Sequence, residues 1–333
     1  MLRAAAILLV VVQHATWGGP LLVPELGARP FEMSVQVGAS TLMVISAYFI
    51  CQTLRSSGPW LLVRNRLGRM LPPFAVASVL TYALTRWFGP DALHRDSEDL
   101  TATLLILPPS LLDELDLVDP SYWTVPLQVM AFAAAAMLWR TRCSSGWWLR
   151  VVLWAAVVIP VVISAVVLPL DDSGALATLH GDLGVHRTHL FAVGAALWLW
   201  ATGRSGHTIL LMIPAAVAAH HFHTEDLPSS LALGVACGLI AAAATGPDWS
   251  HPALRPLVWL AGISYGIYLV NHNIGYTVMY QLRLAGASPA VQSAAMVTAS
   301  IALGWLLTRT VEQPAARWVA STPPRQPDTP ATR

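Results

Sequence analysis

The stretch LRAAAILLVVVQHATW, Leu2 to Trp17, decides the fold class of this chain. It is apolar enough to enter a membrane as a helix, and apart from Gln13 it carries two strongly polar side chains, Arg3 and His14. Their spacing amounts to about three helical turns, which brings both to one face and sets His14 about 16 Å further along the axis. An ionisable group at that depth is costly in a bilayer, so His14 predicts a functional site.

The composition of the whole chain agrees with a polytopic membrane protein. Of its 333 residues, 55% are hydrophobic and 11% charged, against about 25% charged in soluble domains. The mean hydropathy is +0.57. The formal net charge of +1 gives no reason to expect a nucleic-acid partner. The cysteines, Cys51, Cys143 and Cys237, lack metal-ligand spacing, so we expect neither a disulfide framework nor a bound metal.

The hydropathy pattern predicts an all-α bundle of about ten membrane spans in one domain, residues 1–318, with a disordered cytoplasmic tail over 319–333. The spans are expected at 3–19, 32–54, 70–88, 121–139, 149–168, 188–203, 207–222, 229–247, 257–280 and 288–308. Arginines concentrate in alternate loops and acidic residues in the others, which places both termini in the cytoplasm. In the longest external segment, 89–120, the amphipathic stretch 101–115 either lies on the membrane surface or forms a plain loop.

A second polar group lies in RNRLGRMLPPF, Arg64 to Phe74, at the expected cytoplasmic side. Arg66 and Arg69 are close together on a helical face, and Pro72 and Pro73 are expected to mark the start of the third span. These arginines are either a positive-inside anchor or a clamp for a phosphorylated ligand that arrives from the cytoplasm.

A third group lies in LVWLAGISYGIYLVNHN, Leu257 to Asn273. On one continuous helix, Tyr265, Tyr268 and His272 form a single stripe, and His272 reaches a depth like that of His14. Polar stripes in membrane helices face the bundle interior or a cavity, although an interfacial aromatic belt would give a similar pattern.

A fourth group lies in SYWTVPLQVMAF, Ser121 to Phe132. Trp123 suits an outer-interface anchor. Gln128 is a buried amide that makes either a helix–helix hydrogen bond or a catalytic contact. Further along, His220, His221 and His223 favour an interfacial polar cap over a metal site, because adjacent histidines point apart on a helix.

Seven segments, taken in order, resemble the acyltransferase-3 family of membrane-bound O-acyltransferases. They are LRAAAILLVVVQH (2–14), GASTLMVISAYFI (38–50), RLGRMLPPF (66–74), WTVPLQVMAF (123–132), HLFAVGAAL (189–197), ISYGIYLVNH (263–272) and VEQPAARW (311–318). They resemble the family's opening Arg and His helix, its second helix, and its R-x-x-R-x-x-P, Trp-Ser/Thr-Leu, Phe-x-x-Gly, Ser-Tyr-x-x-Tyr-Leu-x-His and Glu-x-Pro segments.

The resemblance implies a ten-helix enzyme in the plasma membrane of a bacterium. It would move an acyl group, commonly acetyl, from cytoplasmic acyl-CoA as co-substrate, with no bound cofactor, to a hydroxyl of a glycan sugar or of a glycosylated small molecule. His14 would be the catalytic base. The resemblance and the cytoplasmic position together assign acyl-CoA binding to Arg3, Arg64, Arg66 and Arg69. The remaining candidates would line the pore: Ser46, Trp123, Gln128, Ser264, Tyr265, Tyr268 and His272. Of these, Tyr265, Tyr268 and His272 would either line the pore or polarise the thioester carbonyl.

The chain also departs from the family pattern. Gln128 stands where many members have a carboxylate, and Ser46 is followed by Ala47 where the family has Ser-Gly. Either the carboxylate has a positional role only, or the acceptor differs, or the chain is an inactive member. A transporter or exporter that uses His14 in a proton relay is the rival from another class. No inverted repeat or pair of Gly/Pro-broken helices favours that rival.

Overall fold

The computed structural model describes residues 1–107, 115–141, 145–170, 180–181, 183–246 and 251–321, and every regular element within them is helical. The α-helices are α1 (Leu2–Gln13), α2 (Gly19–Leu22), α3 (Gly38–Phe88), α4 (Ser97–Leu104), α5 (Thr124–Trp139), α6 (Gly146–Val162), α8 (Thr188–Ala201), α9 (Met212–Thr224), α10 (Leu227–Thr245), α11 (Arg255–Gly262), α12 (Ser264–Val270), α13 (Asn273–Leu284), α14 (Pro289–Leu307) and α15 (Gln313–Ser321). Turns of π-helix follow α1 (His14–Gly18), α6 (Ile163–Val167) and α14 (Thr308–Glu312). Short 3-10 segments occupy Pro24–Leu26, Asp91–Leu93, Pro120–Trp123, Val185–Arg187, His207–Leu211 and Pro252–Leu254.

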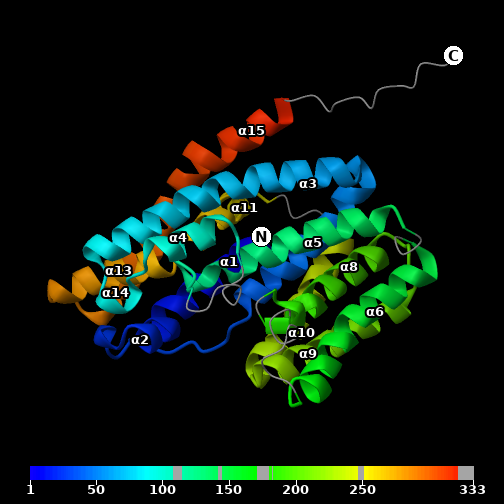
Figure 1. The fold of residues 1–333 in the computed structure, drawn as a ribbon, viewed down its shortest axis with the longest axis horizontal. Coiled ribbons are helices and arrows are strands. Elements are labelled where there is room, and N and C mark those ends of the chain that lie inside the picture. The colour runs from blue at the N-terminus through cyan, green and yellow to red at the C-terminus, as the bar shows by residue number, and fades with distance from the viewer. Residues whose placement is uncertain (108–114, 142–144, 171–179, 182, 247–250, 322–333) are drawn as a thin grey trace.

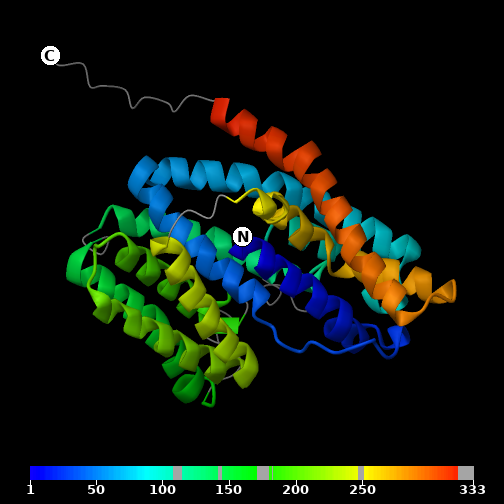
Figure 2. The same cartoon turned by 180° about the vertical axis from the view of Figure 1, so that it is seen from behind.

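Helix α1 lies in the middle of the molecule, where it packs against α3, α11, α12 and α14. Helices α6, α8, α9 and α10 gather on one side, against the first half of α3, and α11 to α15 lie on the other (Figures 1 and 2). The apolar core follows this division: one cluster joins α1, α3, α5 and α12, and a second joins α3, α8 and α10. The polar residues of α1 therefore lie where the two sides of the bundle meet.

Six of the described helices are long and apolar enough to cross a membrane, and the bent pair α11 and α12 would make a seventh. The expectation of a multi-pass, all-helical membrane protein is confirmed. Helices α8 and α9, predicted as spans, have 14 and 13 residues, fewer than the roughly 20 of a usual crossing. The count of ten spans and the cytoplasmic termini stay predictions.

Helix α3 corrects the prediction that spans two and three are separate helices. It runs from Gly38 to Phe88 and changes direction at Gly58, whose φ of 78° suits a residue without Cβ (Figure 1). Pro72 and Pro73 lie inside this helix rather than at its start. The two prolines deprive the Gly68 and Arg69 carbonyls of their usual helical donors, which membrane helices tolerate through local adjustment. Next to them, the Tyr265 hydroxyl donates to the Met70 carbonyl at 3.0 Å.

The ninth predicted span, 257–280, is also not one continuous helix. It is broken into α11, α12 and α13, with breaks at Ile263 and at Asn271–His272. The α11–α12 pair bends by 48°. The stripe expected from Tyr265, Tyr268 and His272 is therefore divided: the two tyrosines lie on α12, and His272 lies at the break that follows it.

The remaining boundary predictions fall partly outside the described residues. The amphipathic stretch 101–115 begins in α4, which carries a reciprocal capping box between Asp96 and Asp99, but residues 108–114 are not described. Helix α15 continues to Ser321, three residues into the segment 319–333 predicted as a disordered tail. The rest of that segment, 322–333, lies outside the described residues.

Small residues allow the helices around the site to approach closely. A Cβ on Gly304 of α14 would lie 2.5 Å from the backbone nitrogen of Ile267, and one on Gly266 would lie 2.3 Å from the Gly304 carbonyl oxygen. Helices in membranes associate through such small-residue contacts, since lipid supplies no hydrophobic drive between them. This contact fixes α12, which carries Tyr265 and Tyr268, against α14.

Candidate functional site

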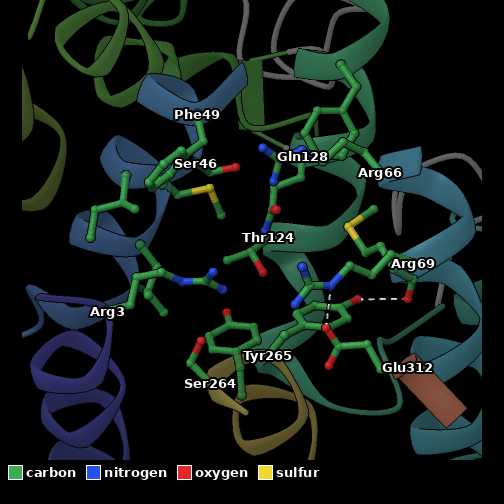
Figure 3. Close-up of a pocket in the computed structure, with 17 residues that line it drawn as sticks. Arg3, Ser46, Phe49, Arg66, Arg69, Thr124, Gln128, Ser264, Tyr265 and Glu312 are labelled. Atoms are coloured by element: carbon green, nitrogen blue, oxygen red, sulfur yellow. Dashed lines mark hydrogen bonds and ion pairs between the residues drawn. The ribbon is translucent and has the colours of Figure 1, made fainter. Parts of the chain in front are cut away.

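Two adjoining cavities occupy the region where α1, α3, α5 and α12 meet. The first, which we call the arginine cavity, has a volume of about 810 Å³ with its open mouth included. It is lined by Arg3, Ala39, Leu42, Met43, Ile45, Ser46, Phe49, Arg66, Arg69, Met70, Thr124, Gln128, Phe132, Ser264, Tyr265, Tyr268 and Glu312 (Figure 3). Three arginines against one glutamate leave its wall with an excess of positive charge.

The glutamate of this wall comes from the π-helical turn Thr308–Glu312. Arg69 Nε donates to Glu312 Oε1 at 2.6 Å, as the dashed line in Figure 3 shows, and Thr308 Oγ1 donates to Glu312 Oε2 at 3.1 Å. The Glu312 side chain is 1% exposed, whereas that of Arg69 is 48% exposed. The buried carboxylate thus holds Arg69 in place while part of its guanidinium stays open to a ligand.

The other arginines differ in position. Figure 3 shows Arg3 and Arg66 entering the arginine cavity from opposite walls, on α1 and on the second half of α3. Arg64 is not part of the cavity wall; its Nε donates to Asn65 Oδ1 at 3.3 Å on the exposed face of α3. Three of the four predicted donor-side arginines are therefore brought together, and the fourth lies outside.

The rest of the predicted pore residues divide between the two cavities. Ser46, Gln128, Ser264 and Tyr265 line the arginine cavity, and Ser264 Oγ donates to the Ala261 carbonyl at 2.9 Å. Tyr268 lines both cavities, as does Ala39. The Tyr268 hydroxyl donates to the Ser121 carbonyl at 2.6 Å, which links α12 to the start of α5.

The second cavity, which we call the histidine cavity, has a volume of about 770 Å³ with its mouth included. It is lined by Leu9, Val10, Gln13, His14, Val35, Gln36, Gly38, Ala39, Ser40, Pro120, Ser121, Trp123, Arg187, Tyr268 and His272. The structure thus brings His14, Trp123, Tyr268 and His272 to one wall. Because Tyr268 and Ala39 belong to both linings, the two cavities are neighbours that share these two residues as a wall.

The hydrogen bonds around His14 assign its tautomer. Asn271 Nδ2 donates to the Tyr268 carbonyl at 2.7 Å, so Asn271 Oδ1 is the atom that faces His14. His14 Nδ1 lies 2.7 Å from this oxygen and must carry the proton. Nε2 then has the free lone pair, and no hydrogen bond to it forms within the described part of the chain. This is the tautomer that a general base needs.

His14 also begins the π-helical turn His14–Gly18. Such turns inside helices occur frequently at functional sites, because they re-aim side chains at the expense of regular hydrogen bonding. The ring of His272 meets the ring of His14 edge-on, with centroids 4.6 Å apart. The break between α12 and α13 therefore brings the two histidines into direct contact.

A buried carboxylate explains why the helix breaks at this point. Asp119 accepts the backbone N–H of Ser121 at 2.8 Å and that of Asn273 at 2.9 Å, and it lies 3.4 Å from His272 Nδ1. Asn273 Nδ2 donates to the Val118 carbonyl at 2.9 Å, so its Oδ1 faces His272 Nδ1 at 2.8 Å. Side chains replace the helical hydrogen bonds and fix the orientation of His272.

Several residues of these networks and linings are absent from the site predicted from sequence, among them Asn271, Asp119, Glu312 and Arg187. Asn271 is adjacent to His272 in the segment NHN, but its contact with His14 depends on the break after α12. Asp119 is one of several acidic residues in its segment, and the Asp-Pro-Ser start of the 3-10 segment marks it only as a cap. Glu312 belongs to the Glu-x-Pro segment, which carries no predicted role. Arg187 is an isolated basic residue in the sequence, without a motif around it.

No group of three or more His, Cys, Asp or Glu side chains in the described ranges has metal-binding geometry. Cys51 and Cys237 are free thiols, and Cys143 lies outside the described residues. Neither cavity lining, as described, contains a cysteine, so the polar side chains available for chemistry are imidazoles, guanidiniums, amides, hydroxyls and the carboxylate of Glu312.

The fold and the two cavities define a multi-pass membrane protein whose interior offers a histidine and several arginines to a ligand. Comparison with protein families gives the chemistry: the family described as an acyltransferase domain, acyltransferase-3, matches residues 1–309. The chain belongs to this family and is a membrane acyltransferase, which confirms the resemblance carried by the seven segments. No curated protein and no solved structure matches the chain.

Proposed function

We propose that this protein transfers an acyl group, acetyl in the simplest case, from acyl-CoA to a hydroxyl of a sugar or of a glycosylated small molecule. The observation that carries the proposal is the wall that the two cavities share at Tyr268 and Ala39. One cavity offers basic side chains to an anionic donor, and the other offers an imidazole lone pair to a hydroxyl. The proposed setting is a bacterial plasma membrane, with the Arg3 end of α1 on the cytoplasmic side.

The donor would occupy the arginine cavity. Arg3, Arg66 and Arg69 would contact the phosphates of CoA, because guanidinium groups pair with phosphate oxygens through two parallel N–H bonds. Arg64, outside the wall, would act on the approaching nucleotide through its charge alone. The long pantetheine arm suits the axial separation of about 16 Å between Arg3 and His14.

The acceptor would occupy the histidine cavity. His14 Nε2 takes the proton of the acceptor hydroxyl while the hydroxyl oxygen attacks the thioester carbonyl carbon. The tetrahedral intermediate collapses, the carbon–sulfur bond breaks, and the His14 imidazolium returns its proton to the CoA thiolate. The products are the ester and free CoA, so atoms and charge balance without a further reactant.

Hydrogen bonding narrows the candidates for stabilising the oxyanion of that intermediate. The hydroxyls of Tyr265 and Tyr268 already donate to backbone carbonyls, so both tyrosines support the wall rather than the reacting atoms. Ser121, by contrast, lines the histidine cavity, and its Oγ is buried without a hydrogen-bond partner in the described residues. A buried hydroxyl without a partner calls for one. We assign the donor to Ser121.

The test uses the purified protein in phosphatidylcholine nanodiscs with radiolabelled acetyl-CoA and a panel of glycans and polyketide sugars. We expect label transfer to at least one acceptor and thermal stabilisation by CoA. His14→Ala should lower transfer about 10²- to 10⁴-fold, the range for a lost general base, and keep the CoA stabilisation. His251→Ala, in a loop outside both cavities, is the matched control.

Wild-type transfer by His14→Ala would overturn the assignment of the base. A transporter or exporter should ignore both CoA and acetyl-CoA. Binding of CoA without turnover by any acceptor would instead indicate an inactive member of the family.

A further inference from the structure

One charged residue of the histidine cavity has no part in the transfer described above. Among the described residues that line this cavity, Arg187 is the only Arg, Lys, Asp or Glu, so no carboxylate lies on that wall. Arg69 and Arg95 differ in this respect, because they pair with Glu312 at 2.6 Å and with Asp116 at 3.4 Å.

The guanidinium of Arg187 is held from two directions. Its Cζ lies 4.1 Å from the centre of the Trp123 ring, a cation–π distance. Its Nε donates to His186 Nε2 at 3.0 Å. No hydrogen bond or ion pair to Nη1 or Nη2 forms within the described part of the chain. The guanidinium is therefore held at its Nε by His186 and on its face by Trp123, while Nη1 and Nη2 stay available to a ligand.

His186 can accept this bond only as a neutral imidazole. Its Nδ1 lies 2.8 Å from the His180 carbonyl and must donate to it, which leaves Nε2 as the acceptor for Arg187. Burial lowers the pKa of His186 to about 4, so the ring stays neutral near pH 7. His186 is therefore a positioning residue for Arg187.

More histidines lie behind His186, and two of them, His220 and His223, belong to the group predicted as an interfacial cap, whose third member, His221, is exposed at the end of α9. His220 is 2% exposed, and His189 Nε2 lies 3.1 Å from its Nδ1. The rings of His180 and His223 lie 5.5 and 5.8 Å from that of His186, between centroids. Among the described residues, these imidazole rings form a packed, hydrogen-bonded support for His186.

We propose that the acyl acceptor carries an oxyanion, a carboxylate or a phosphate, that binds the free end of Arg187. A partly buried cation is costly without a counter-ion, and the described cavity wall supplies none. A planar guanidinium with one edge fixed presents a fork that matches two oxygens of such a group. Arg187 and His14 line the same cavity, so an acidic sugar held by Arg187 presents its hydroxyls to the base. This inference rests on the proposed acyl transfer.

The binding test measures affinities by calorimetry for the full chain in phosphatidylcholine nanodiscs saturated with CoA. The probes are methyl glycosides in matched pairs: glucuronate with glucose, galacturonate with galactose, and glucose 6-phosphate with glucose. We expect at least one acidic member to bind roughly 10- to 100-fold more tightly than its neutral partner, the range for a charge-assisted pair. Equal affinities in every pair would overturn the proposal.

Variants of Arg187 distinguish the contribution of its two-pronged hydrogen bonding from that of its positive charge. Arg187→Gln should abolish the preference for the acidic sugar, and Arg187→Lys should keep part of it, because lysine retains the charge without the two-pronged geometry. His186→Ala should lower the affinity for the acidic sugar and leave the affinity for the neutral sugar unchanged. His186→Gln offers an acceptor oxygen to Arg187, so it should restore part of the affinity for the acidic sugar. Arg95→Gln removes an arginine paired outside both cavities and should leave the preference intact. A preference that survives Arg187→Gln would overturn the proposal.

Two further arms distinguish a lipid anion from a sugar anion, and anion binding from acyl transfer. In nanodiscs of phosphatidylglycerol, the anionic headgroups can compete with the sugar for Arg187. Loss of the preference for acidic over neutral sugars there would assign the anion to a lipid headgroup and overturn the acceptor proposal. If acidic sugars bind through Arg187 but no label moves from acetyl-CoA, acyl transfer fails and the anion site stands. If label moves to acidic and neutral sugars with equal KM, the anion site fails and acyl transfer stands.

Discussion

The arginine cavity and the histidine cavity adjoin each other but are built from different interactions. Charge dominates the first, where three arginines face one buried glutamate and Arg69 is half exposed. Short hydrogen bonds dominate the second, where Asn271 holds His14 and Arg187 is the one arginine on the described wall. The difference indicates that the first suits capture of a charged donor over distance, whereas the second fixes atoms for a proton transfer.

Gln128, which replaces the carboxylate of other family members, belongs to the charged side of this division. It lies on the arginine cavity, so it is not the group that orients His14. Asn271 orients His14, and the carboxylate next to the histidine pair is Asp119, which contacts His272 rather than His14. An amide can fix the tautomer of a histidine as a carboxylate does, provided that its own orientation is fixed.

The largest expected effect concerns the stability of the histidine cavity. Asp119→Ala leaves the backbone N–H groups of Ser121 and Asn273 without their acceptor, at about 1–3 kcal/mol each, so we expect a loss of about 3 kcal/mol in the free energy of unfolding. Detergent unfolding followed by circular dichroism measures it. Asp116→Ala, which removes a surface ion pair, should cost about 1 kcal/mol or less. Equal losses in both variants would contradict this account.

The next effect is on the rate. Asn271→Leu removes the acceptor that keeps the proton on His14 Nδ1, so the imidazole samples the wrong tautomer and orientation. We expect kcat for acyl transfer to fall roughly 10- to 100-fold, by analogy with lost outer-shell partners, with KM for acyl-CoA unchanged. Asn271→Asp keeps an acceptor oxygen but loses the N–H that donates to the Tyr268 carbonyl, so it should recover only part of the rate. An unchanged kcat in Asn271→Leu would show that His14 needs no orienting partner.

In the arginine cavity the effect should appear in KM instead. Arg66→Gln removes one guanidinium from the wall, so we expect KM for acyl-CoA to rise roughly 10-fold, the value of one charge-assisted hydrogen bond, with a smaller change in kcat. The dependence of KM on ionic strength should also weaken, because fewer charges attract the donor. Arg86→Gln, on an exposed face of α3 away from both cavities, is the control. A loss confined to kcat would place Arg66 in the chemistry rather than in donor binding.

The smallest effect is expected at Gln128. Gln128→Glu restores the carboxylate of other family members, but it does so on the arginine cavity, where His14 is already oriented from the other side. We expect turnover to change by roughly threefold at most, which corresponds to less than about 1 kcal/mol. Steady-state rates with labelled acetyl-CoA measure it. A gain of two orders of magnitude would show that a carboxylate at this position takes part in the reaction.

Several features of the fold could be predicted from sequence because they depend on local pattern. Low charge and long apolar segments predicted a multi-pass helical protein, and the seven segments predicted the acyltransferase family. The change of direction at Gly58 and the breaks at Ile263 and Asn271 were not predicted, since hydropathy does not distinguish a continuous membrane helix from a bent one. Pro72 and Pro73 predicted the start of a helix, but both lie inside α3, because a membrane helix can tolerate proline in its interior.

The sequence by itself determined which residue types were available: a histidine and an arginine on one face of the first helix, two arginines three residues apart, and a segment rich in Tyr, Asn and His. Tertiary structure alone decided which of them meet. Asn271 reaches His14 across 257 positions, and Arg187 enters the same cavity from the other side of the bundle. The physical reason is that hydrogen bonds and ion pairs act over a few ångströms, so partners are chosen by how the helices bend and pack, not by spacing along the chain.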